Sequence, residues 1–105
     1  MPRNIRIAAV QAEPLPIGAP LDAFAADLTR VVTDNEGVGL VMYPELHLFG
    51  SEEEAPERRN TLLRNSAAPL EGPLVAALGA LAREAGVWLI PGSVCELGPH
   101  GELFN

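Results

Sequence analysis

The sequence predicts an α/β fold with a βαβ unit at its centre. Residues 5–11 and 38–43 form two short apolar runs that are typical of strands, and the segment between them has the apolar spacing of a helix. Two strands joined through a helix lie parallel in one sheet, with a right-handed crossover. Because both runs are almost continuously apolar, we expect each strand to be buried on both faces.

The first strand is expected over 5–11 (IRIAAVQ). Its odd-numbered residues from Ile5 to Ala9 lie on one face, whereas Ala8 and Val10 lie on the other. Neither face carries a polar stripe at these positions, so the strand is expected inside a layered structure.

A loop and an amphipathic helix follow. The loop is expected over 12–19, which contains two prolines and one glycine. Pro20 suits the first helical position, and Gly37 provides a natural stop. Asp27 and Arg30 are expected on the solvent side of the helix. The apolar residues form one stripe along it: Leu21, Phe24, Ala25, Leu28, Val31 and Val32.

The most informative stretch is 38–50 (VGLVMYPELHLFG), in which an acid directly follows a strand. Pro44 ends the strand because it has no N–H for a sheet ladder. Glu45 therefore stands at the carboxyl end, where ligands and catalytic groups gather in open α/β sheets. Apolar neighbours surround it in the sequence: Tyr43, Leu46, Leu48 and Phe49. A carboxylate among such groups is costly to ionise unless a partner stabilises it. The alternative is an ordinary surface glutamate.

The second half of the chain is predicted to add two helices. A short helix begins near Pro56, and a longer one covers 72–85, with Pro73 at its start and Gly86 at its end. Four acids near the first of these helices lack the spacing of a calcium loop and are expected to form a solvated face: Glu52, Glu53, Glu54 and Glu57.

The last part of the chain is predicted to form a hairpin. A third strand is expected over 87–95, with a bulge or an edge at Pro91 and Gly92. After a turn at 97–101, residues 102–105 begin a fourth strand that is antiparallel to the third. The sheet is then mixed. No linker or repeat divides residues 1–105, so we expect one domain without an internal boundary.

The composition excludes several classes of function. The formal net charge is −7, with 14 acids and 7 bases, which argues against nucleic acid and against an anionic membrane surface as partners. Cys95 is the only cysteine, so no internal disulfide can form. We find no signal-peptide pattern and no apolar run long enough to span a bilayer, and we therefore expect a cytoplasmic protein.

Five short segments form a pattern that extends over the whole chain. They are Val10-Gln11, Pro44-Glu45-Leu46 followed by Gly50, the Ala-Arg-Glu-Ala-Gly run at 82–86, Pro91-Gly92-Ser93, and Leu103-Phe104-Asn105. In this order and spacing they resemble the nitrilase, or carbon–nitrogen hydrolase, superfamily. The resemblance implies that residues 1–105 are the N-terminal portion of an αββα sandwich, roughly its first third to two-fifths.

The resemblance also implies a chemistry. Members of this superfamily cleave non-peptide C–N bonds with a Glu general base, a Lys that stabilises the oxyanion and a Cys nucleophile. Glu45 matches the base. All seven bases of this sequence are Arg, so the Lys has no counterpart here. The implied substrate is a small amide, or less commonly a nitrile, with no cofactor or metal. The full-length protein is expected to form oligomers of identical chains.

Cys95 and the two histidines allow other interpretations. Cys95 lacks the sequence context of the family nucleophile and is expected to be a small, partly buried apolar residue. His47 is expected at the pocket mouth and His100 in solvent, and Glu45 with His47 offers too few ligands for a metal. The isolated chain should then be inactive. A stand-alone α/β binding domain is the alternative function, and acyl transfer to an amine is a third.

Overall fold

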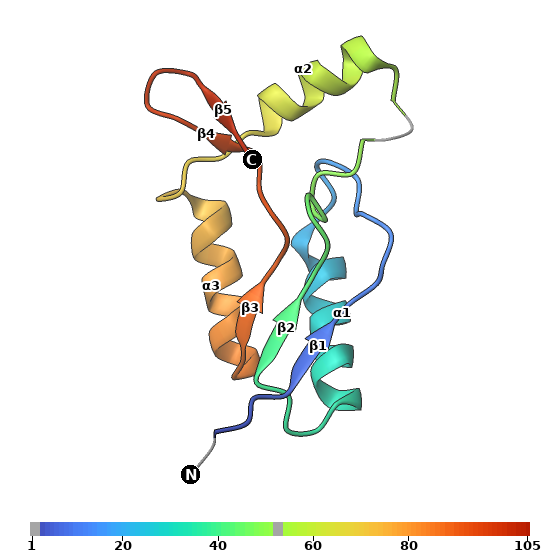
Figure 1. Cartoon of the computed structure of the whole chain (residues 1–105). Coiled ribbons are helices and arrows are strands. Elements are labelled where there is room, and N and C mark those ends of the chain that lie inside the picture. The colour runs from blue at the N-terminus through green and yellow to red at the C-terminus, as the bar shows by residue number, and fades with distance from the viewer. Residues whose placement is uncertain (1–2, 52–53) are drawn as a thin grey trace.

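The computed structural model describes residues 3–51 and 54–105, which are organised around a parallel sheet (Figure 1). The sheet contains β1 (Ile7–Ala9), β2 (Leu40–Met42) and β3 (Trp88–Ile90), in that order. All pairings are parallel, and Ala8, Val41 and Leu89 lie side by side across the sheet. The α/β class and the βαβ unit predicted from the sequence are therefore confirmed, although the strands are shorter than the apolar runs.

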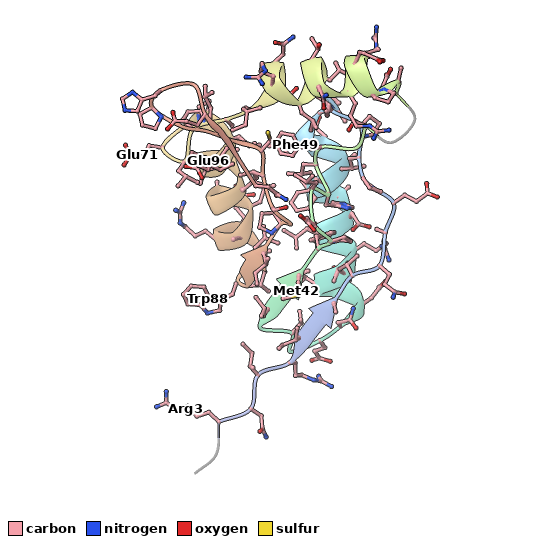
Figure 2. The ribbon with its side chains drawn as sticks, turned by 45° about the horizontal axis from the view of Figure 1, so that its top comes forward. Arg3, Met42, Phe49, Glu71, Trp88 and Glu96 are labelled. Atoms are coloured by element: carbon pink, nitrogen blue, oxygen red, sulfur yellow. The ribbon has the colours of Figure 1, made fainter. Side chains whose placement is uncertain are left out.

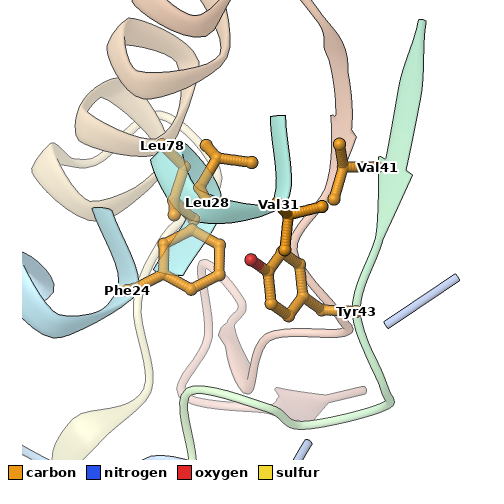
Figure 3. Close-up of a cluster of buried hydrophobic side chains, with 6 residues drawn as sticks. All are labelled: Phe24, Leu28, Val31, Val41, Tyr43 and Leu78. Atoms are coloured by element: carbon orange, nitrogen blue, oxygen red, sulfur yellow. The ribbon is translucent and has the colours of Figure 1, made fainter. Parts of the chain in front are cut away.

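Two helices cover one face of this sheet. They are α1 (Leu21–Asp34) and α3 (Pro73–Ala85), which contact each other. Helix α1 buries Phe24, Leu28 and Val31, as its apolar stripe predicts, and α3 contributes Leu78. These side chains meet Val41 and Tyr43 from the sheet side (Figure 3). Burial of such side chains contributes about 1.5–3 kcal/mol each, so this layer is the core of the described chain.

The opposite face of the sheet is exposed, which corrects the expectation of burial on both faces. Alternate strand residues point there, and all of them are apolar: Ile7, Ala9, Leu40, Met42, Trp88 and Ile90. Ile7 is 55% exposed and Trp88 is 76% exposed. The Trp88 side chain extends away from the ribbon (Figure 2). An apolar composition of this kind is typical of strands that are buried on both faces, but no described residue covers the second face.

The remaining elements lie beyond the carboxyl ends of the strands (Figure 1). They are α2 (Pro56–Ser66), β4 (Glu96–Leu97) and β5 (Leu103–Phe104). Helix α2 begins at the predicted proline. Strands β4 and β5 pair in an antiparallel hairpin. Of the four acids expected on a solvated face, Glu57 is exposed and Glu54 half-buried, whereas Glu52 and Glu53 lie outside the described residues.

The predicted third strand over 87–95 contains only β3, and β4 begins after it in a separate sheet, so the expectation of one mixed sheet is wrong. Strand β3 ends at Ile90, and Pro91 follows, which has no N–H to donate. Gly92 has a φ of 93°, a conformation that no regular strand adopts. The chain therefore leaves the parallel sheet here, and the hairpin is built from β4 rather than from the extension of β3. None of the helices in the described ranges is long and apolar enough to cross a membrane.

Candidate active site

Glu45 lies where the sequence places it, just past the carboxyl end of β2. The Tyr43 N–H still donates to the Ile90 carbonyl oxygen (2.8 Å), and a turn over residues 45–48 begins two residues later. The Glu45 side chain is exposed, and its carboxylate accepts a hydrogen bond from the Asn105 side-chain amide. The carboxylate is thus paired with a neutral donor at the edge of the sheet.

The apolar surroundings expected for this carboxylate are absent from the described part of the chain. Tyr43 and Phe49, its neighbours in the sequence, point into the interior and are only 3% and 4% exposed. Leu46 and Leu48 are half-buried. Tyr43 therefore belongs to the core and Leu48 packs against it, whereas the Glu45 side chain is exposed.

The turn that carries Glu45 has an unusual backbone. Leu46 has a φ of 51°, the left-handed region that non-glycine residues rarely adopt, and within the described residues it is the only such case. Its N–H donates to Ser93 Oγ (3.1 Å), and the His47 N–H donates to the Pro44 carbonyl oxygen (3.2 Å). The Pro91-Gly92-Ser93 segment therefore supports the turn from a neighbouring strand.

Gly92 shows how closely these two segments approach. A Cβ atom at Gly92 would lie 2.1 Å from the Pro44 carbonyl oxygen and 3.2 Å from His47 Cβ. No side chain fits there, so the segment after β3 can pack on the turn only with glycine at this position. Together with the Asn105 contact, three of the five segments identified in the sequence meet at this site: Pro44-Glu45-Leu46, Pro91-Gly92-Ser93 and the segment that ends with Asn105.

His47 lies beneath the turn and not at a pocket mouth, which corrects that expectation. It is 3% exposed, and its ring packs at 4.8 Å from the Tyr43 ring and 6.1 Å from the Phe24 ring. Among the described residues, its Nδ1 has no hydrogen-bond partner. Burial lowers the pKa of the imidazole, and the nearby Asp27 carboxylate opposes this only in part. His47 is therefore a neutral core residue near pH 7.

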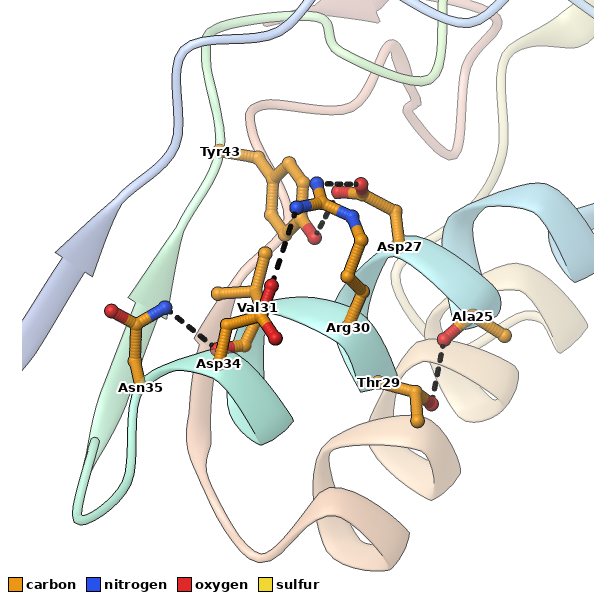
Figure 4. Close-up of polar contacts among 8 residues, drawn as sticks. All are labelled: Ala25, Asp27, Thr29, Arg30, Val31, Asp34, Asn35 and Tyr43. Carbon is orange, nitrogen blue, oxygen red and sulfur yellow. Dashed lines mark hydrogen bonds and ion pairs between the residues drawn. The ribbon is translucent and has the colours of Figure 1, made fainter.

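A polar network next to this histidine was not predicted from the sequence (Figure 4). The Tyr43 hydroxyl donates to Asp27 Oδ2 (2.8 Å), and Arg30 Nη2 donates to Asp27 Oδ1 (2.6 Å). Partial burial alone would raise the pKa of Asp27, but the hydrogen bonds from Arg30 and Tyr43 outweigh it and lower that pKa. Burial, and then the bond to Asp27, raise the pKa of Tyr43. A buried tyrosine hydroxyl requires a hydrogen-bond partner, so a tyrosine at the end of a buried strand is the feature of the sequence that could have predicted this network.

Cys95 is buried, as expected for a small apolar residue. It lines a pocket of about 320 Å³ between α2, the β4–β5 hairpin and the Glu45 turn. Two residues connect this pocket to Glu45: Leu46 follows it in the sequence, and Asn105 donates a hydrogen bond to its carboxylate. The rest of the lining is Asn60, Leu63, Arg64, Leu103 and Phe104. The pocket is mainly apolar, with a volume in the range of small-molecule sites.

The remaining candidates from the sequence are His100 and a metal site. His100 is exposed, as expected, and only its backbone N–H is bonded, to Glu102. Within residues 3–51 and 54–105, no group of three or more His, Cys, Asp or Glu side chains converges as a metal site would require.

The comparisons with known proteins add no relative. No protein-family model matches the sequence, and no curated protein matches it. The functional interpretation therefore depends on the residues at the carboxyl edge of the sheet.

Proposed function

We propose that residues 1–105 form the part of a carbon–nitrogen hydrolase that carries its general base, Glu45. The observation that carries the proposal is the convergence of separate sequence segments on this residue. Ser93 bonds to the residue after Glu45, Gly92 packs on the residue before it, and Asn105 bonds to its carboxylate. Catalytic groups of α/β folds gather at this same edge of the sheet.

The reaction proposed is hydrolysis of a small amide, with a nitrile as the less favoured substrate. Glu45 would take the proton from a cysteine thiol, and the thiolate would attack the amide carbon. Glu45 would then pass this proton to the amide nitrogen, so that the C–N bond breaks, the amine leaves and an acyl thioester remains. Glu45 would then take a proton from the water that hydrolyses this thioester. The exposed carboxylate is accessible to both proton donors.

Two of the three groups needed for this reaction must come from outside residues 1–105. The sequence has no lysine to stabilise the oxyanion. Cys95 is a poor candidate for the nucleophile, because it is buried and held by the hydrogen bond from the Ala68 N–H to its own carbonyl oxygen (2.9 Å). We propose that both missing groups lie further along the same polypeptide.

The bare face of the sheet supports the αββα part of this proposal. Six apolar residues line that face, and α1 and α3 cover only the other one. In an αββα sandwich, a second sheet packs on such a face, about 10 Å away. The described residues would then supply one helical layer and part of one sheet.

Glu45→Gln in the full-length protein tests the proposal. A panel of small amides and nitriles should identify a substrate, and the variant should lower kcat about 10²–10⁴-fold, the range expected when a general base is lost. Glu71→Gln is the matched control, since Glu71 is also exposed but lies at the start of the segment leading into α3. Unchanged turnover in the Glu45 variant would disprove the assignment.

The isolated 105-residue chain provides a second test. It should show no amide turnover, because it lacks the lysine and an accessible thiol. Turnover that disappears in Cys95→Ser would instead identify Cys95 as the nucleophile and overturn this proposal.

The pocket beside Glu45 favours a second candidate, a small α/β binding domain without catalysis. Its volume of about 320 Å³ and apolar lining suit a small ligand on their own. The coding region after Asn105 separates the two functions. A lysine followed later by a cysteine next to an aromatic residue and Asp supports the hydrolase, whereas an immediate stop supports the binding domain.

A further inference from the structure

We propose that Ser93 is a positioning residue for Glu45. It would act through the peptide group between Glu45 and Leu46, whose N–H donates to Ser93 Oγ at 3.1 Å. This inference rests on the proposed function, because it assigns Ser93 to the machinery of the same site. Ser93 does not touch the carboxylate itself.

The backbone of Leu46 depends on support from its surroundings. Its φ of 51° places it in a sparsely populated region, which persists only where surrounding contacts hold it. The peptide held by Ser93 sets both the ψ of Glu45 and the φ of Leu46. A turn that relaxed to an ordinary conformation would rotate this peptide and redirect the Glu45 Cα–Cβ bond.

The Ser93 hydroxyl reaches the turn from a different strand. Ser93 lies on the segment that leaves the sheet after β3, and this segment packs against Pro44 because Gly92 has no side chain. The Glu45 turn is therefore fixed to the end of β3 and not only to its own strand. The Ser93 side chain and the Leu46 N–H are both half-buried, so water competes weakly for this hydrogen bond.

The Asn105 contact has a different character. Both Asn105 and Glu45 are exposed, so water can replace the amide at the carboxylate. The contact at Ser93 fixes the backbone that carries Glu45, whereas the contact at Asn105 orients only the end of the side chain. Positioning of a reacting group requires the first kind of contact, since a displacement of about 1 Å can cost about 10²-fold in rate.

The experiment compares four variants of the full-length protein. Ser93→Ala removes the acceptor, and Ser93→Cys keeps the size of the side chain with a weak acceptor. Ser93→Thr keeps the hydroxyl, and Ser66→Ala is the control because Ser66 is also a half-buried serine but belongs to another element, the end of α2. For each variant, kcat, KM, the pH profile and the exchange rate of the Leu46 amide hydrogen are measured.

The Ala and Cys variants should exchange the Leu46 amide about 5- to 10-fold faster than the wild type, as expected for the loss of one such bond. Their kcat should fall about 10- to 100-fold, with KM within about two-fold of the wild type. The Thr variant and the Ser66 control should resemble the wild type in both measurements.

Two results would overturn the inference. One is an unchanged exchange rate at Leu46 in both the Ala and the Cys variants. The other is a lower melting temperature with unchanged kcat, which would make Ser93 a structural residue only. If the wild-type protein hydrolyses no amide or nitrile, the proposed function fails and the catalytic role of Ser93 fails with it. The Leu46 exchange rate would still show whether Ser93 holds the turn.

Discussion

At the scale of single residues, the polar groups of the core are organised around Asp27. Its carboxylate accepts hydrogen bonds from Tyr43 and Arg30, so the buried hydroxyl of Tyr43 is satisfied and the charge of Asp27 is paired (Figure 4). Arg30 is exposed, however, so solvent screening leaves its ion pair with Asp27 little weight in the free energy of folding. The more consequential bond is therefore the one from Tyr43, because it keeps a buried hydroxyl from remaining unpaired.

His47 makes the free energy of unfolding depend on pH. Burial lowers its pKa in the folded state below the unfolded value of about 6.5, so the unfolded chain binds more protons in this range. The stability is therefore complete above about pH 6.5 and decreases as the pH falls from there towards the lower folded pKa. The maximum slope for one proton is about 1.4 kcal/mol per pH unit.

Substitution of each histidine in turn checks this dependence. His47→Phe keeps an aromatic ring against Phe24 and Tyr43 and should remove the extra loss of stability below about pH 6.5. His100→Gln should retain that loss, because His100 is exposed. Urea unfolding at several pH values measures both. Equal slopes in the wild type and the His47 variant would contradict the prediction.

The sequence predicted the position of Glu45 but not its exposure. Pro44 determines where the strand ends, and this signal is local. The exposure depends on how the turn over residues 45–48 is folded, and that in turn depends on Ser93 and Gly92, about 47 residues away in the sequence. The burial of His47 was missed for the same reason, since no local pattern distinguishes a core histidine from one at a pocket mouth.

At the scale of elements, the helices and the βαβ unit were predictable, whereas the division of the last strands into a second sheet was not. Helices α1, α2 and α3 begin next to prolines, and α3 ends at a glycine, as their sequences indicate. Pro91 and Gly92 were identified as an interruption, but they do not reveal that the chain enters a second sheet. Strand β4 finds its partners in Ala68 and β5, and such long-range pairings leave no periodic signal.

The two glycines of the α3 region should respond oppositely to alanine. Gly86 has a φ of 70° at the end of the helix, so Gly86→Ala should cost about 1 kcal/mol. Gly79 lies on an exposed side inside α3, with no atom within 4 Å of a built Cβ, so Gly79→Ala should gain about 0.5–1 kcal/mol.

Chemical denaturation of the 105-residue chain measures both changes. The two variants serve as controls for each other, because they add the same methyl group to the same part of the chain. Destabilisation by both would indicate that the described helix packing at Gly79 is incorrect, and stabilisation by both would contradict the left-handed end of α3.

At the scale of the whole molecule, the parallel sheet and the helices on one face of it form two layers, and the other face of the sheet is open among the described residues. Helices α1 and α3 cover the sheet on one face, and α2 with the hairpin extends the molecule beyond the strand ends, which gives overall dimensions of 50 × 29 × 24 Å. The open side is a continuous apolar surface across β1, β2 and β3. Surfaces of this kind mark an interface.

The 105-residue chain should therefore associate with itself through this face. Trp88, at 76% exposure, is its most exposed large residue. Trp88→Lys should reduce the association and change the free energy of unfolding by no more than about 0.5 kcal/mol, because the side chain is outside the core. Leu70→Lys is the matched control, since Leu70 is 57% exposed but lies away from the sheet. Sedimentation velocity over a range of concentrations distinguishes the variants.

In the full-length protein, the same substitution should strongly lower the free energy of unfolding. If a second sheet covers the face, Trp88→Lys places a charge and a truncated side chain in a buried layer, and the loss should reach about 3–5 kcal/mol. A large loss in the full-length protein, combined with almost none in the 105-residue chain, would locate the missing layer on this face. A small loss in both would mean that the face stays open to solvent, and the αββα arrangement would then have to be abandoned.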